Sequence, residues 1–583
     1  ITLILFLELS DARSILPASG SAVLKSLMTG TLHIWMCFST MSLFINFEHK
    51  ASRMTAATAH QLPIGSSTFS ALRAGGEIYV DKTALLFNLC SGRRKIFLSR
   101  PRRFGKSLLV STFESLFKYG LRDFAGLDIE SLWKDQTYCV VRLDFSEIKE
   151  FDSPDDFQSQ FVRLLQERFA DAGYAGTGDL LTFSTWLSKL PDTSLVLLID
   201  EYDAPLTACL DNPEAFNAVQ KLLNSFYLKL KAHEGCLRFF FMTGITKLSS
   251  TGIFSTFNNL TDVSTDACYG TLLGYTEEEI CRNFEPYLEN AKKLLKLSSA
   301  ELLSKLREHY NGFCFDENAA SHVYCPWSVL NFLAAPQRGF QNYWYQSGGQ
   351  PSVLMQYLKS HKLEDPAKYN AAIGLSLADL SASQSITRIS LEALLVQSGY
   401  LTIKKLLMPG YVEVGYPNRE VSVSMARLYA DELLRNADRI EIGLPRIEET
   451  LANGTLDQVV ELFNGVFNSI DYQRYPVRDE HACRAFLQVL LLGAAMLPQV
   501  EVHTSQGRSD LEVDAGRRHW VFELKFAQTM AQAHRLLAEA VLQVQSRGYG
   551  QTPHNKKLTR AVLVFSAENR RFVAWQKIEN EKA

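Results

Sequence analysis

The stretch Lys95–Gly120, KIFLSRPRRFGKSLLVSTFESLFKYG, decides the fold of this chain. Its apolar run Ile96–Leu98 is followed by a short polar loop, which opens into Leu108–Phe117, where apolar residues recur at helical spacing. We therefore expect a strand, a phosphate-binding loop and a helix. The backbone N–H groups of such a loop and the positive end of the helix dipole favour a polyphosphate.

The loop ends in Gly-Lys-Ser, and these residues carry its chemistry. Lys106 would reach the β- and γ-phosphates of ATP, and the Ser107 hydroxyl would bind Mg²⁺. The general pattern G-x-x-x-x-G-K-[ST] has glycine where this chain has Arg100, so a helix start that binds nothing is the alternative. Clustered cations favour the functional interpretation, because they need a polyanion or solvent. The predicted ATP-binding residues of the loop are Arg102, Arg103, Phe104, Gly105, Lys106 and Ser107.

Length and composition limit the class of protein. A chain of 583 residues is too long for one core, so about three domains are expected. A hydrophobic content of 46% is that of an ordinary globular protein, and a net charge of −3 is no global nucleic-acid signature. Ten cysteines without a C-x-x-C pair argue against zinc modules and a disulfide framework. They fit a reducing compartment, and we expect a cytoplasmic protein.

The first 60 residues differ from the rest of the chain. They contain two apolar runs, Ile1–Leu9 and Leu32–Phe47, and the second has about 16 residues and includes His33 and Ser39. A membrane span needs ~20 largely apolar residues. There is no basic n-region and no clean small-residue cleavage site for a signal peptide. We expect an extension of undefined role, and a membrane anchor is the alternative.

Further apolar runs follow the loop and alternate with helical stretches, which predicts a parallel sheet of the wound α/β type. These runs are YCVVRLDF (Tyr138–Phe145), LVLLIDEYD (Leu195–Asp203) and LRFFFMT (Leu237–Thr243).

Asp200 and Glu201 end one of these strands at the carboxyl edge of the sheet, where ligands bind in such folds. Asp200 is predicted to hold Mg²⁺, and Glu201 to polarise the water that attacks the γ-phosphate. The alternative is a strand end with solvated acids. Thr243, at the end of the next strand, is predicted to sense the γ-phosphate. The alternative is a strand-end threonine without a role in binding.

From about Thr276 the pattern becomes mostly helical. It is interrupted by aromatic and glycine clusters, which favour packing between helices over a ligand site. These clusters are Tyr310–Phe313, Val323–Phe332, Asn342–Gly348 and Ser398–Leu401. Within Tyr411–Val423, the tripeptide Tyr416-Pro417-Asn418 predicts a turn between short β segments.

Near the end of the chain, GRSDLEVDAGRRHWVFELK (Gly507–Lys525) alternates polar and apolar residues on both sides of a turn. This pattern predicts a hairpin. If Asp514 faces His519, Asp510 faces Glu523, and directly opposed residues have Cβ atoms about 4.5–5.5 Å apart. Two such carboxylates can hold one cation.

Lys525 is two residues from Glu523 and therefore shares its face. Two carboxylates and a lysine suit metal-assisted phosphodiester hydrolysis, with Asp510 and Glu523 on Mg²⁺ and Lys525 orienting or activating the water. The amphipathic helix Asp479–Leu492 could bring Glu480 to the same metal. A second helix, His534–Tyr549, carries Gln543.

The alternative for this stretch is an edge hairpin with a solvated charged face, because Glu512 and Asp514 lie on that face too.

Taken together, these motifs resemble those of the AAA-ATPase-like proteins that carry a C-terminal PD-(D/E)XK nuclease-superfamily domain. The resemblance extends from about residue 61 to about residue 575. It rests on Tyr79–Thr83, Arg100–Ser107, Leu198–Asp203, Tyr310–Gly312, Ser398–Thr402, Tyr416–Asn418, Gly507–Asp510 and Glu523–Lys525. The chain departs from the superfamily pattern in having Ser509 instead of proline before Asp510.

The resemblance implies specific roles for these residues. It implies ATP binding by Gly105, Lys106 and Ser107, and Mg²⁺ coordination by Asp200. For the C-terminal half it implies that the metal and catalytic residues are Glu480, Asp510, Glu523 and Lys525, with Gln543 as an accessory catalytic residue.

We therefore predict an α/β protein with a P-loop NTPase parallel sheet, a helical middle region and a C-terminal α/β domain of the restriction-endonuclease type. The predicted domains are an extension (1–60), an AAA-like ATPase (61–275), a mostly helical middle or lid region (276–430) and a nuclease-like domain (431–583). The expected function is ATP hydrolysis coupled to Mg²⁺-dependent cleavage of nucleic acid.

The chief alternative is a non-catalytic, ATP-dependent switch whose C-terminal domain binds nucleic acid or a protein. A membrane-anchored NTPase, which would depend on residues 1–47, is a third hypothesis. DNA or RNA is the expected partner, a homo-oligomer is a second candidate, and no membrane partner is expected.

Overall fold

The computed structural model describes residues 61–578 except residues 93, 248–259, 347–353, 355–372, 382–388, 435–445, 469–475, 495, 497, 505–506, 548 and 550–555. Residues 1–60, for which we expected an extension or a membrane anchor, lie outside the described residues.

The first sheet is parallel, as predicted, and has the strand order β2-β3-β4-β1-β5. Its strands are β1 (Arg94–Ser99), β2 (Cys139–Asp144), β3 (Leu195–Asp200), β4 (Leu237–Gly244) and β5 (Thr261–Asp262). Because β4 lies between β1 and β3, the ends of β1 and β3 flank a single strand. Neighbouring strands are ~4.8 Å apart, so the phosphate loop after β1 and the acids that end β3 lie about 10 Å apart at one edge.

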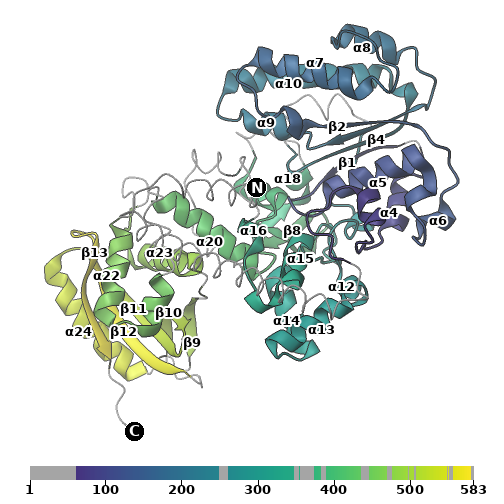
Figure 1. Cartoon of the computed structure of the whole chain (residues 1–583). Helices are drawn as coiled ribbons and strands as arrows, with labels where there is room; N and C mark the ends of the chain where they lie inside the picture. The colour runs from purple at the N-terminus through teal and green to yellow at the C-terminus, as the bar shows by residue number, and fades with distance from the viewer. Residues whose placement is uncertain are drawn as a thin grey trace, which may run out of the picture. The chain divides into compact units, whose positions relative to one another are not determined.

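Helices cover both faces of this sheet (Figure 1). Along β4, Phe239 and Phe241 pack against Phe113 of α5, whereas Phe240 and Met242 face the core that contains Phe226 of α10. Both faces are buried, which is why these strands are apolar throughout. The helices are α3 (Phe69–Ala74), α4 (Thr83–Cys90), α5 (Lys106–Tyr119), α6 (Ile129–Leu132), α7 (Pro154–Phe169), α8 (Leu180–Leu187), α9 (Ala204–Ala208) and α10 (Pro213–Ala232).

The middle region is mostly helical but also contains an antiparallel sheet of order β6-β8-β7. Its strands are β6 (Ile373–Ser376), β7 (Thr402–Met408) and β8 (Tyr411–Gly415). Its helices are α12 (Glu277–Asn283), α13 (Glu285–Leu295), α14 (Ser299–Tyr310), α15 (Pro326–Ala334), α16 (Tyr343–Gln346), α18 (Leu377–Ser381), α19 (Leu391–Ser398) and α20 (Arg419–Leu434).

The prediction that Tyr416-Pro417-Asn418 forms a turn between two β segments is wrong in part. Strand β8 precedes the tripeptide, but the element that follows it is helix α20, which begins at Arg419. The Asn418 side-chain oxygen accepts a hydrogen bond from the Val421 N–H at 3.0 Å, as a helix cap does. Its amide nitrogen donates to the Asn311 carbonyl at 2.7 Å. The tripeptide therefore starts a helix and ties it to the end of α14.

The C-terminal sheet has the order β13-β12-β11-β10-β9. Its strands are β9 (Gln499–Thr504), β10 (Gly507–Ala515), β11 (Arg518–Ala527), β12 (Lys557–Ser566) and β13 (Arg571–Ile578). The β11–β12 pair is parallel and the other pairs are antiparallel, so the sheet is mixed. The predicted hairpin is β10–β11, and it occupies the centre of the sheet, not an edge.

Three helices accompany this sheet: α22 (Leu456–Phe467), α23 (Glu480–Gly493) and α24 (Met530–Arg547). The side chains of α24 pack on the face that carries Val521 and Val562. Phe463 and Phe467 of α22 contact Phe522 and Phe565 on the opposite face. The arrangement is consistent with an α/β nuclease-like domain, and Figure 1 shows α24 and α22 on either side of its strands.

Candidate functional sites

The phosphate loop connects β1 to α5 through backbone conformations that favour glycine. Gly105 caps α5 with φ +94°, and Arg103 also has a positive φ of +69°. The Lys106 side chain is buried, and its Nζ donates to the carbonyl oxygens of Arg100 and Pro101, at 3.0 Å each. Burial lowers the pKa of this amine. Lys106 is thus held over the loop by two carbonyls that a phosphate oxygen could replace.

Arg100, where the general motif has glycine, is a structural residue. Its guanidinium donates to the carbonyls of Ser99 at 2.9 Å, Ser264 at 2.5 Å and Tyr269 at 3.2 Å, and it lies 4.3 Å from the ring of Phe315. Only 1% of the residue is exposed, so these bonds replace its solvation. Arg100, which stands in place of the glycine, therefore anchors the loop to the segment after β5.

Acidic residues from β3 face the start of α5. The Ser107 side chain is near the Asp200 carboxylate, which is fully buried and whose pKa is raised by that burial. Arg142 lies 3.5 Å from the same carboxylate. Glu201 has a positive φ of +49°, a strained conformation for a residue other than glycine, and burial raises its pKa. Lys106, Ser107, Asp200 and Glu201, predicted from separate motifs, are thus brought together.

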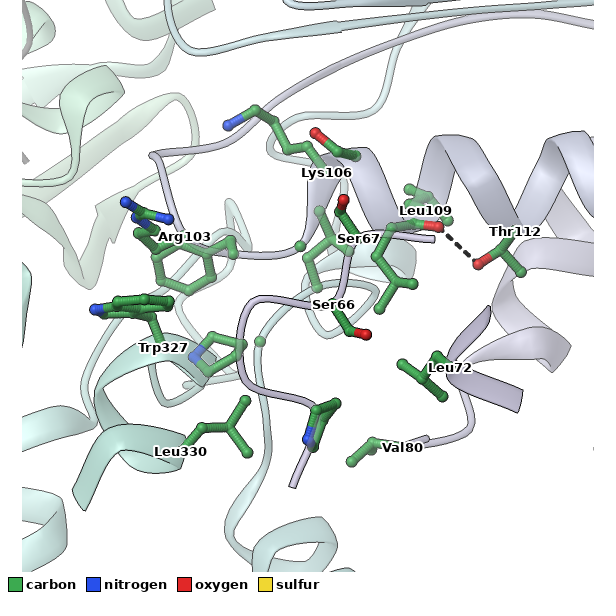
Figure 2. Close-up of a pocket in the computed structure, with 18 of the residues that line it drawn as sticks. Ser66, Ser67, Leu72, Val80, Arg103, Lys106, Leu109, Thr112, Trp327 and Leu330 are labelled. Carbon is green, nitrogen blue, oxygen red and sulfur yellow. Dashed lines mark hydrogen bonds between the residues drawn. The ribbon is translucent and has the colours of Figure 1, made fainter. Parts of the chain in front are cut away.

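A pocket of about 520 Å³ adjoins this loop, a volume suited to a nucleotide-sized ligand. Figure 2 shows Arg103 against Trp327, with which it makes a cation–π contact of 4.4 Å, and Leu330 and Val80 along another wall. The lining comprises Pro63, Gly65–Ser67, Leu72, Ile78–Val80, Lys82, Arg102–Leu109, Thr112, Lys149, Glu201, Leu272–Tyr275, Pro326, Trp327 and Leu330. The pocket is polar at the loop and apolar beyond it.

Two predicted nucleotide-binding residues have other contacts. Phe104 lines the pocket but is 1% exposed, and its ring packs edge-on against Phe313 and Phe315. The Thr243 hydroxyl donates to the Leu98 carbonyl at 2.7 Å within the sheet, and Thr243 does not line the pocket. Their assignment as ATP ligands stays a prediction.

Sequence reasoning missed two groups of residues at this site. Pro326, Trp327 and Leu330 line the pocket, although the sequence of their stretch favours packing between helices. Asp203 is nearly fully buried, and its carboxylate accepts hydrogen bonds from the Ile245 and Thr246 N–H groups. It holds the end of β3 against the end of β4. The sequence feature that could have identified Asp203 is its position close to the acidic pair Asp200-Glu201.

The C-terminal hairpin has the expected register. Asp514 pairs with His519 and Leu511 with Phe522, which aligns Asp510 with Glu523. The Asp510 carboxylate accepts a hydrogen bond of 2.7 Å from the Leu524 N–H.

One oxygen of the Glu523 carboxylate is held by two hydrogen bonds, and the other has none from the described residues. Its Oε1 accepts hydrogen bonds from Lys525 Nζ at 2.8 Å and from Gln543 Nε2 at 2.7 Å. Its Oε2 is buried and accepts no hydrogen bond from any described residue. Burial, followed by the negative charge of Asp510, raises the pKa of Glu523 to about 7. An orphaned carboxylate oxygen beside a second carboxylate fits a divalent cation, which would also relieve their repulsion.

Glu480, at the start of α23, is less closely placed. Its Oε1 lies 3.7 Å from Lys525 Nζ, and burial raises its pKa. Within the described part of the chain, no group of three or more His, Cys, Asp or Glu side chains is arranged to hold a metal ion. The fit therefore rests on the pair Asp510 and Glu523, and two carboxylates are a usual protein contribution to a Mg²⁺ site.

Most of the charged face of the hairpin is buried, since α24 packs on it, and Asp514 at the turn end is exposed. Glu512 is 3% exposed and His519 is 4% exposed, and their side chains contact each other at 3.2 Å. His519 also contacts Asp514 at 2.7 Å. The alternative of an edge hairpin with a solvated charged face is therefore wrong.

The fold and its two candidate sites are those of an AAA-ATPase-like domain joined to a nuclease-like domain. Residues 63–254 match the family model described as a predicted AAA-ATPase, and residues 478–575 match the PD-(D/E)XK nuclease superfamily. The chain thus contains an AAA-ATPase-like domain and a C-terminal domain of the PD-(D/E)XK nuclease superfamily. It is also 29% identical, over 84% of this chain and 93% of the relative, to an uncharacterized protein in the vnfD 5′ region of Azotobacter chroococcum mcd 1.

None of the described helices is both long enough and apolar enough to cross a membrane.

Proposed function

We propose that this protein binds and hydrolyses ATP in the pocket beside the phosphate loop. Lys106 exchanges the carbonyls of Arg100 and Pro101 for phosphate oxygens, and the N–H groups at the start of α5 stabilise the same anion. Ser107 and Asp200 would hold Mg²⁺, which would neutralise phosphate charge. Glu201 orients the attacking water, and its raised pKa improves it as a proton acceptor near neutral pH.

The apolar part of the pocket supports the binding of a nucleoside as well as a polyphosphate. Leu72, Val80, Leu109 and Leu330 surround the space beyond the loop (Figure 2). Trp327 and Leu330 belong to α15 of the middle region, so a bound nucleotide contacts both the ATPase sheet and that region. We propose that this contact transmits the nucleotide state to the rest of the chain and so controls cleavage.

We propose that the C-terminal domain hydrolyses phosphodiester bonds of DNA or RNA. Asp510 and Glu523 would hold Mg²⁺, which would activate water and stabilise the developing charge. Lys525 favours the ionised form of Glu523 through its 2.8 Å contact and orients the water, while Gln543 fixes the carboxylate from α24. Glu480 positions Lys525 from the other side.

The observation that carries this proposal is the buried Oε2 of Glu523. It has no hydrogen-bond partner among the described residues, and Asp510 adds a second negative charge beside it. A structural role alone leaves this cost unexplained, because a buried carboxylate oxygen without a partner costs about 1–3 kcal/mol. A cation bound between the two acids removes that cost.

The test combines two substitutions with one control. Lys106→Ala should lower ATP hydrolysis at least about 100-fold, and Lys525→Ala should lower Mg²⁺-dependent cleavage of labelled DNA and RNA by a similar factor. Lys118→Ala, at an exposed position of α5, should change neither rate. Cleavage by Lys525→Ala at the wild-type rate would refute the nuclease. If ATP binding depends on Lys106 but no nucleic acid is cut, the non-catalytic switch is favoured instead.

We also propose a reducing compartment such as the cytoplasm. The nine cysteines within the described residues are all free thiols, six of them buried and three exposed, as expected where disulfides do not form. Finding the protein in a reducing compartment would support this, and intermolecular or intramolecular disulfides in the native protein would contradict it.

A further inference from the structure

A second pocket, of about 530 Å³, lies in the nuclease-like domain and is not used by the proposed chemistry. We call it the basic pocket. It is lined by Gly454–Asp457, Arg518, Trp520, Lys557, Thr559 and Trp575–Lys577. Four elements, α22, β11, β12 and β13, contribute to it.

The basic pocket is separate from the carboxylate site. Arg518 is the first residue of β11, and Glu523 lies five residues further on, about 17 Å along the strand. Because side chains alternate along a strand, Arg518 and Trp520 project from the face opposite to that of Glu523. A ligand in the basic pocket therefore cannot touch the proposed catalytic residues.

The chemistry of the basic pocket is cationic and aromatic. Arg518, Lys557 and Lys577 bring three positive charges, against the single carboxylate of Asp457. That carboxylate accepts a hydrogen bond of 2.7 Å from Trp575 Nε1, which fixes the indole ring. The Arg518 guanidinium is likewise anchored, because it donates to the Gly454 carbonyl at 2.5 Å.

Each of these groups suits one part of a nucleic-acid strand. Both lysines are exposed, so their ammonium groups can reach phosphates at little desolvation cost. The indole of Trp575 is half-buried and lines the pocket, and a base can stack on such a ring. The volume admits about one nucleotide.

We propose that the basic pocket binds the sugar–phosphate backbone of single-stranded nucleic acid, with a base stacked on Trp575. This inference deepens the proposed nuclease function by adding a non-catalytic contact to the substrate strand. The pocket holds the strand away from the cleavage point, so it contributes to affinity and KM but not to the chemical step.

The experiment measures binding of fluorescently labelled single-stranded DNA and RNA in EDTA, so that no cleavage occurs, at several salt concentrations. The variant is the double substitution Lys557→Gln, Lys577→Gln. Each lost phosphate contact should lower the slope of log K against log salt by about 0.7, so the double variant should lose about 1.4. Trp575→Ala should weaken binding about tenfold with little change in slope.

A matched control is the double substitution Lys189→Gln, Lys221→Gln, at two exposed positions that line neither pocket. It should leave slope and affinity unchanged. If the double variant folds poorly, Lys577→Gln alone, on the edge strand β13, replaces it. This single variant should lower the salt slope by half as much. ATP affinity serves as the check of folding for every variant.

The outcomes separate this inference from the nuclease proposal. The basic pocket is overturned as a nucleic-acid site if the double variant keeps the wild-type salt slope and affinity. It is also overturned if the wild type binds neither single-stranded DNA nor single-stranded RNA. If the slope falls as expected but no strand is ever cut, the pocket stands and the nuclease proposal fails. If cleavage proceeds with an unchanged KM in the double variant, the nuclease stands and the pocket is overturned.

Discussion

Glu420, at the start of α20, offers a prediction about stability that depends on pH. It is 3% exposed, its Oε1 accepts a hydrogen bond from the Trp344 N–H at 2.8 Å, and its Oε2 accepts one from the Ser328 hydroxyl at 2.8 Å. Burial raises the pKa of this carboxyl from 4.5 to about 8. The folded protein therefore retains a proton that the unfolded chain releases.

The sign and size of the effect follow from that difference. The raised pKa contributes stability that is fully present below pH 4.5 and is lost as the pH rises toward 8. Each pKa unit corresponds to about 1.4 kcal/mol. Between pH 5.5 and pH 8, wild-type stability should thus fall by about 3 kcal/mol on account of this one group. Glu420→Gln cannot titrate and should lack this loss.

The assay is denaturant unfolding of wild type and Glu420→Gln from pH 5.5 to pH 8, followed by tryptophan fluorescence, to which the buried Trp344 beside Glu420 contributes. The free energy of unfolding of the variant relative to wild type should rise by about 3 kcal/mol across this range. Glu285→Gln, at an exposed position of α13, is the control and should follow the wild type at every pH. A pH-independent difference for Glu420→Gln would refute the reasoning.

Three further substitutions test the parts that support the nucleotide site. Arg100→Gly restores the glycine of the general motif, yet it should destabilise the fold by about 3 kcal/mol, because three carbonyls lose a buried donor. It should also weaken ATP binding, and an unchanged ATP affinity measured by calorimetry would contradict this. Gly399→Ala should lower the free energy of unfolding by about 2–3 kcal/mol in thermal unfolding, since the new Cβ would lie 2.7 Å from Pro101 Cβ. Gly410→Ala, where the space around the new Cβ is open, should lower it by about 1 kcal/mol, and equal losses in the two variants would disprove the packing argument. Asp203→Asn should lower the melting temperature and ATP turnover together, because its oxygens accept two backbone N–H groups, and a loss of turnover without a loss of stability would show a direct catalytic role instead.

Much of the fold follows from local patterns. The loop of residues 100–107 and the strand ending at Asp200 were predictable, because each is a continuous run whose apolar residues and breakers coincide with its structure. The hairpin register was predictable as well, since one turn at Gly516 sets every pair along two strands.

The rest depends on contacts between distant segments. Trp327 reaches the pocket from more than 200 residues beyond the loop, and nothing in its own stretch distinguishes a pocket wall from helix packing. The basic pocket is built by side chains from four elements, none of which carries a motif alone. The helix after Pro417 was missed because Asn418 serves equally well in a turn and as a helix cap, and only its contact with Asn311 decides between them.

The proposed chemistry requires two separate divalent-ion sites, and Mn²⁺ binding followed by electron paramagnetic resonance counts them. Wild type should bind one ion without nucleotide and a second when a non-hydrolysable ATP analogue is present. Asp510→Asn should lose the nucleotide-independent ion and keep the other. If Asp510→Asn binds Mn²⁺ without nucleotide as tightly as wild type, the carboxylate face of the hairpin is not a metal site and the proposed nuclease is wrong.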